Sequence, residues 1–102
     1  MSEDQYSVSR WADETFGPAS SNARVAARAN EEMAELIRAL TVDDNHPQAG
    51  EEIADIVIIL YRLATRLNSD VSAEIERKMM INRGRKWKLS HDGHGYHVRD
   101  RV

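Results

Sequence analysis

The chain has 102 residues, of which 41% are hydrophobic and 30% charged, and its formal net charge is −3. This composition is typical of a folded globular domain and excludes an intrinsically disordered chain. It contains no cysteine, which excludes a disulfide framework and a thiolate zinc site and is compatible with a reducing cytoplasm. The acidic N-terminus lacks a signal-peptide pattern, and the longest apolar run, around residues 56–60, is too short to span a membrane. We therefore expect one cytoplasmic domain over residues 1–102, with no membrane contact, that gains buried surface by forming oligomers.

Basic residues are concentrated at one end of the chain. Eight of the 14 lysines and arginines lie from Arg77 onward, whereas the middle of the chain is acidic. A basic end alone is compatible with nucleic-acid binding, but the acidic middle makes that partner unlikely. Both halves together favour a protein that holds a phosphorylated small molecule over a metal ion.

The first predicted helix begins after Ser7 or Ser9 and ends at Gly17, which is followed by proline. Its two large aromatic residues, Trp11 and Phe16, are expected to anchor the core. A base-stacking role for Trp11 is the less favoured alternative.

A second helix is predicted from caps at residues 20–22 to about Leu40, and its apolar residues fill one arc at 100° per residue. Glu32 borders that arc and Glu35 lies about 60° further out. A solvated acid would instead lie opposite the apolar arc. This placement favours a ligand role for Glu32 over an ordinary surface charge.

A third helix is predicted over residues 48–68, antiparallel to the second because the turn-forming segment 41–50 joins them. Glu52 falls inside its apolar arc and Asp55 just outside. A carboxylate in an apolar stripe is costly unless it is paired or bound to a metal. The helix dipole is an alternative explanation for acids in the first turn of a helix, such as Glu52.

Two pairs of carboxylates would face each other across this helical hairpin, Glu32 with Glu35 and Glu52 with Asp55. Residues three apart share a helix face. Four carboxylates repel one another unless a cation lies among them, and their hard oxygen atoms suit Mg²⁺, or Mn²⁺ in its place, better than zinc.

A fourth helix is predicted from Val71 to about Arg85, with Lys78, Asn82 and Arg85 on one face. These side chains form a candidate clamp for phosphate and ligand. A basic, solvated helix end is the alternative that spacing alone favours. The helical core thus covers residues 7–87, followed by a basic tail, residues 88–102.

The tail is rich in glycine and histidine, with His91, His94 and His97 spaced by three residues. That spacing resembles metal ligation on a helix, but the glycines argue against a helix here. Solvated histidines are the favoured interpretation.

These elements together resemble the MazG-like family of all-α nucleoside triphosphate pyrophosphohydrolases, in its small single-domain form. That family has Glu-x-x-Glu on one helix, here Glu32 to Glu35, and Glu-x-x-Asp on the next, here Glu52 to Asp55. The resemblance continues into a Lys-x-x-x-Asn-x-x-Arg segment, here Lys78 to Arg85, and covers roughly residues 8–87.

The resemblance implies an all-α, four-helix-bundle-like subunit whose active core is completed in a homodimer or homotetramer. It implies Mg²⁺-dependent hydrolysis of (deoxy)nucleoside triphosphates to monophosphate and pyrophosphate, as in nucleotide-pool house-cleaning. The metal ligands would be Glu32, Glu35, Glu52 and Asp55, and the nucleotide contacts would be Lys78, Asn82 and, less directly, Arg85. Hydrolysis also needs a group that takes a proton from water, and Glu35, at the outer edge of its pair, is our candidate.

Two alternatives stay open. Phosphoribosyl-ATP pyrophosphatase uses a similar acidic bundle, but Tyr61-Arg62 departs from the Tyr-His expected there. A non-catalytic helical interaction module would need neither metal nor carboxylates.

Overall fold

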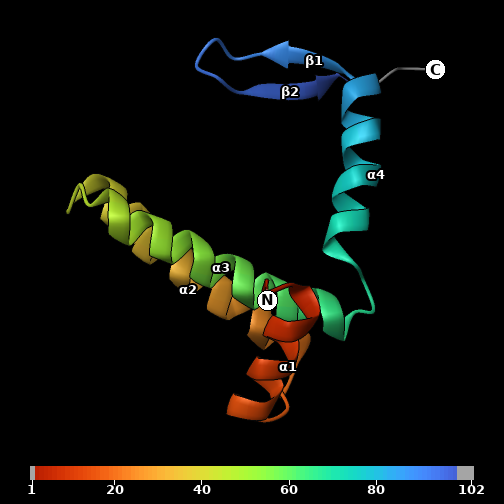
Figure 1. Ribbon diagram of the computed structural model, residues 1–102. Helices are drawn as coiled ribbons and strands as arrows, with labels where there is room; N and C mark the ends of the chain where they lie inside the picture. The colour runs from red at the N-terminus through yellow and green to blue at the C-terminus, as the bar shows by residue number, and fades with distance from the viewer. Residues whose placement is uncertain (1, 99–102) are drawn as a thin grey trace. The chain divides into compact units, whose positions relative to one another are not determined.

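The structure, a computed structural model, describes residues 2–98. Its elements are four helices and one strand pair, in the order α1 (Gln5–Phe16), α2 (Asn22–Thr41), α3 (His46–Arg66), α4 (Val71–Gly84), β1 (Lys86–Leu89) and β2 (Gly95–Val98) (Figure 1). The chain divides into two compact units between Val71 and Ser72. None of the helices in the described residues has the length and apolar character that a membrane span requires.

α1 begins earlier than the sequence predicts. Asp4, and not Ser7 or Ser9, is the N-cap, since its carboxylate accepts hydrogen bonds from the backbone N–H groups of Tyr6 and Ser7. The Ser7 hydroxyl accepts one from the Asp4 N–H in return, which completes a capping box. Gln5 and Tyr6 therefore already belong to the helix. Gly17 ends the helix with φ 75°, as predicted.

α2 and α3 form the predicted antiparallel hairpin and pack side by side (Figure 1). The Ser21 hydroxyl caps α2 by accepting from the Arg24 N–H. Asn45 caps α3 in the same way, and Pro47 occupies its first turn, so α3 begins two residues before the predicted Gln48.

Buried polar groups fasten α1 to the end of α3. The Gln5 amide donates to the Thr65 hydroxyl at 3.0 Å and to the Ser69 carbonyl at 2.7 Å. Its oxygen accepts from the Val71 N–H at 2.8 Å. Beside it, the Ser9 hydroxyl lies 2.8 Å from the Thr65 hydroxyl. These bonds join the start of α1 to the turn after α3.

The core of the first unit is made of small and branched residues and contains no aromatic ring. Its buried hydrophobic residues are Ala12, Val25, Ala29, Ala39, Ala49 and Ile56. Trp11 and Phe16 are 52% and 67% exposed, so the prediction that they anchor the core is wrong. The reason is that Ala12 and Ser9, not the aromatic residues, lie on the face of α1 that is buried.

Large apolar side chains also remain exposed along the α2–α3 hairpin. They are Met33, Ile37, Leu40, Ile53, Val57 and Leu60, each between 39% and 55% exposed. Most belong to the apolar arcs predicted from the sequence. The single chain therefore covers only part of each apolar stripe.

The second unit holds most of α4 and an antiparallel strand pair in which Trp87 lies opposite His97. The sequence predicts a fourth helix to about Arg85, within a helical core that ends at residue 87, and predicts no strand in the tail. Instead, α4 ends at Gly84, and residues 86–98 form a β-hairpin. The Trp87 indole N–H donates to the Asn82 carbonyl at 2.9 Å, which ties the hairpin to the last turn of α4. The all-α class is confirmed, with this hairpin as the exception.

Candidate metal centre and adjoining pocket

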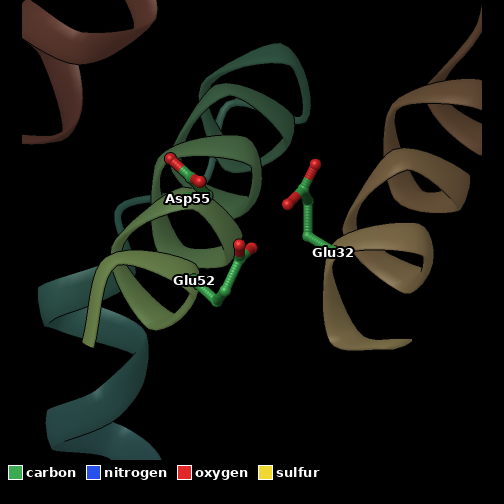
Figure 2. Close-up of side chains that lie close together, drawn as sticks. All are labelled: Glu32, Glu52 and Asp55. Atoms are coloured by element: carbon green, nitrogen blue, oxygen red, sulfur yellow. The ribbon is translucent and has the colours of Figure 1, made fainter. Parts of the chain in front are cut away.

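Three of the four predicted carboxylates come together in the structure. Glu32 extends from α2 toward Glu52 and Asp55 on α3 (Figure 2). One oxygen from each residue lies within 4.8 Å of the others. Three hard oxygen donors on two rigid helices are a suitable ligand set for a divalent cation such as Mg²⁺ or Mn²⁺.

Glu52 is the least satisfied member of this acidic group, which we define as Glu32, Glu52 and Asp55. Its Oε2 is buried and has no hydrogen-bond partner among the described residues. The pKa of Glu52 is raised, first because its protonated form can donate a hydrogen bond to Glu32, then because burial disfavours the charged form. Repulsion from the neighbouring carboxylates adds to the effect. A cation would relieve both the missing contact and the repulsion.

Arg28 is the cation nearest to this group along α2. Its Nη2 donates to Glu32 Oε1 at 3.1 Å, and Nη1 pairs with Glu31. Arg28 lies one turn before Glu32, where opposite charges four residues apart on a helix form an ion pair.

Glu35 lies outside the acidic group. It is exposed, one helical turn beyond Glu32, and its charge still contributes to the raised pKa of Glu52. A carboxylate that is close to the group without being part of it has lone pairs available for a proton.

A pocket with a cavity volume of about 690 Å³ adjoins the acidic group. Its charged lining residues are Glu32 and Asp55 of the acidic group and three arginines, Arg24, Arg28 and Arg62. The apolar lining comes from α1, the segment after it, α2 and α3, and consists of Trp11, Ala12, Phe16, Ala19, Val25, Ile58 and Ile59. The pocket therefore offers carboxylates, cations and an apolar wall to a single ligand.

Trp11 and Phe16 form the aromatic wall of this pocket. Their rings meet edge to face, with centroids 5.4 Å apart and planes at 81°. Both residues thus line a pocket where the sequence predicts a core, and base stacking by Trp11 stays a prediction.

The remaining predicted contacts belong to the second unit. Lys78 and Asn82 lie on α4, and Arg85 follows its last residue, Gly84. Lys78 is exposed, whereas Asn82 and Arg85 are half-buried. Their nucleotide contacts stay predictions.

The histidines of the hairpin do not form a metal site within residues 2–98. In that part of the chain, the acidic group is the only cluster of three or more histidines and carboxylates with ligand spacing. His97 packs against Trp87 instead, with ring centroids 6.1 Å apart.

Comparison with known proteins identifies the family of this chain. The MazG-like family model matches residues 29–96, which include the whole acidic group. A dATP/dGTP diphosphohydrolase of cyanophage S-2L is 38% identical over 72 residues, which span 71% of this chain and 64% of the relative's length. The match thus covers slightly less than two thirds of that relative.

A solved structure has the same fold along nearly the whole chain. It is the cyanophage S-2L MazG-like pyrophosphohydrolase bound to dGDP and three catalytic Mn²⁺ ions per active site. The TM-score is 0.78 at 31% identity, over 95% of this chain and 91% of the other. From the family match and this similarity, the chain belongs to the MazG-like family.

Proposed function

We propose that this protein hydrolyses nucleoside triphosphates to the monophosphate and pyrophosphate with the help of divalent cations. The observation that carries the proposal is the acidic group, with one oxygen from each of Glu32, Glu52 and Asp55 within 4.8 Å. The pocket beside it has the size and the mixed lining that a nucleotide requires. The S-2L proteins, one named for dATP and dGTP and the other bound to dGDP, make purine deoxynucleotides the first candidates.

The acidic group fits a divalent cation by its chemistry. All of its donors are carboxylate oxygens, and the unpartnered Glu52 Oε2 is available as a ligand. The Mn²⁺ ions of the S-2L structure support a divalent metal, and we propose Mg²⁺ or Mn²⁺. When bound, such an ion neutralises phosphate charge and favours ionisation of a nearby water. Glu35 is proposed as a fourth ligand or as the residue that accepts the water's proton.

The rest of the pocket would hold the nucleotide. The aromatic wall would stack on or enclose the base, because an aromatic side chain can stack on the face of any nucleobase. Lys78, Asn82 and Arg85 are proposed to contact the phosphates, since cationic and amide N–H groups stabilise the charge that develops there. These roles come from the family motif.

We also propose that the active protein is a homo-oligomer. The exposed apolar side chains of the α2–α3 hairpin support this, because a stripe of this kind is usually covered in the functional assembly. A role in removing surplus or damaged nucleotides in the cytoplasm is the cellular function that we propose.

The test is product analysis with a panel of canonical and modified nucleoside triphosphates, with and without Mg²⁺ or Mn²⁺. We expect pyrophosphate and nucleoside monophosphate as the products, and only when the metal is present. Glu52→Gln should form neither product. Glu51→Gln is the matched control, because it removes the same charge from the adjacent, exposed position. Orthophosphate as the product, or turnover only of phosphoribosyl-ATP, would contradict the proposal.

A further inference from the structure

Arg62 lines the pocket beside the acidic group and is not one of its three potential metal ligands. Its side chain, which extends from α3, is only 13% exposed although it is charged. It is also the residue that departs from the Tyr-His of the phosphoribosyl-ATP enzymes. An enclosed guanidinium has a high desolvation cost and therefore needs fixed partners.

The partners of Arg62 all lie at the end of α1. Its Nη2 donates to the Gly17 carbonyl at 2.6 Å and lies 3.1 Å from Asp13 Oδ1. Its Nε donates to the same Asp13 oxygen at 3.2 Å. One planar group from α3 thus binds a side chain and a backbone carbonyl of the last turn of α1 together.

The Gly17 carbonyl is held in a conformation that favours glycine. Gly17 has φ 75° and ψ 179°, a region that other residues rarely adopt. Its N–H donates to the Asp13 carbonyl at 2.9 Å, which closes the helix end. Arg62 therefore binds a helix end whose geometry is already specified.

The aromatic wall is carried by this same end of α1. Trp11 precedes Asp13 by two residues and Phe16 precedes Gly17 by one, and both rings are more than half exposed. Burial in the core therefore does not fix their position. Beside the packing of Ala12, the hydrogen bonds and the ion pair of Arg62 join this helix end to α3, on which Asp55 also lies.

We propose that Arg62 is a positioning residue that sets the aromatic wall for the nucleoside part of the substrate. This inference rests on the proposed function for the identity of the ligand. Arg62 would determine how tightly the base is held, and the metal and phosphate chemistry would be independent of it.

The experiment measures binding by the fluorescence of Trp11 in a Trp87→Phe background, which leaves Trp11 as the single tryptophan. The probe is dGDP with Mg²⁺, with dADP in parallel. The variants are Arg62→Met, Arg62→Lys and Asp13→Ala. For each of them, kcat and KM are also measured with the triphosphate that the unmodified protein hydrolyses fastest. Arg66→Met is the matched control, because Arg66 makes a similar tie from α3 to Asn22 at 2.7 Å but does not line the pocket.

We expect Arg62→Met to weaken dGDP binding and raise KM about tenfold, the loss that a misplaced aromatic contact produces. The kcat would change by less than roughly twofold, since the metal site is unaffected. Asp13→Ala would also raise KM. Arg62→Lys would bind dGDP more tightly than Arg62→Met does. Arg66→Met would bind dGDP as tightly as the Trp87→Phe protein does.

Three results would overturn the inference. Unchanged binding in both Arg62→Met and Asp13→Ala would show that the wall does not depend on this tie. If dGDP binding were weaker in Arg62→Met but unchanged in Asp13→Ala, Arg62 would instead contact the ligand directly. Equal loss in Arg66→Met would indicate general loosening of the fold.

Two controls keep these outcomes separate from other failures. If Arg62→Met does not fold, Asp13→Ala decides alone, because Asp13 is 56% exposed and Arg62 keeps its hydrogen bond to the Gly17 carbonyl when Asp13 is lost. The binding titration needs no turnover, so a protein without pyrophosphohydrolase activity would disprove the proposed function and still test the positioning of the wall.

Discussion

Glu32 on α2 and Glu52 on α3 face each other across the helical hairpin, close enough that Glu32 raises the pKa of Glu52 (Figure 2). The buried Oε2 of Glu52 has no hydrogen-bond partner within residues 2–98. A pair of this kind costs stability when both groups are ionised, and it is relieved by a proton or by a cation. The most informative experiments on this protein therefore vary pH and metal.

Without metal, the unfolding free energy should depend on pH through Glu52. Its folded pKa lies above the ordinary value of 4.5, so its stabilising contribution is present below that pH and is lost as pH rises through the raised pKa. In EDTA, thermal unfolding of the wild type should show stability falling as pH rises through the pKa of Glu52. Glu52→Gln should lack this decrease and should be more stable than the wild type near neutral pH. Glu51→Gln should follow the wild type. Parallel pH profiles of all three proteins would contradict this assignment.

Arg28 should compete with metal for Glu32, because its Nη2 lies 3.1 Å from Glu32 Oε1. Its side chain is 58% exposed, so the pair is weak, and Arg28→Ala should tighten Mn²⁺ binding by only about two- to fivefold. Calorimetric titration without nucleotide measures this change. Arg24→Ala, which removes another exposed cation from the same pocket, is the control and should leave the affinity close to wild type. Weaker metal binding in Arg28→Ala would show that Arg28 supports the ligands instead.

Gln5 should be essential for stability, although it is far from the acidic group. Gln5→Ala would leave the Val71 N–H and the Ser69 carbonyl without their partner, at a cost of about 2–4 kcal/mol in unfolding free energy. Urea denaturation would measure the loss. Gln48→Ala, also in the first turn of a helix, should cost well under 1 kcal/mol by comparison. Equal stability of the two variants would mean that the Gln5 bonds are replaced by water.

Glu35→Gln tests the proposed proton acceptor. The substitution keeps the shape of the side chain and removes its basicity, so we expect nucleotide binding to persist and kcat to fall about 10²- to 10⁴-fold. Binding by Trp11 fluorescence and single-turnover hydrolysis separate the two effects. Lost binding with unchanged turnover of bound substrate would instead make Glu35 a ligand for metal or substrate.

The helices and the acidic group could be predicted because both follow from local spacing. Apolar residues at 100° per step and clear caps define α2 and α3, and carboxylates three residues apart share a face wherever the helix lies. Glu35 shows the limit of that argument. Spacing assigns it to the same face as Glu32, but the distance to α3 depends on how the helices pack.

The aromatic wall and the β-hairpin could not be predicted for different reasons. A large aromatic residue usually indicates a core, but Ser9 and Ala12 are the residues of α1 that are buried here, and Trp11 is on the exposed side. In the hairpin, residues 86–98 contain short polar strands whose pairing, Trp87 opposite His97, depends on the turn between them. Both features depend on tertiary contacts that a single sequence does not specify.

The most direct test of the central claim is to add Mn²⁺ to the metal-free protein and to measure its binding by calorimetry and its effect on stability by the shift in Tm. We predict that the wild type and Glu51→Gln bind Mn²⁺ and gain stability, by about 2.7 kcal/mol at a hundred times Kd for a single ion. Glu52→Gln and Asp55→Asn should lose most of both effects. Binding that is absent in the wild type, or unchanged in Glu52→Gln and Asp55→Asn, would contradict a metal centre formed by Glu32, Glu52 and Asp55.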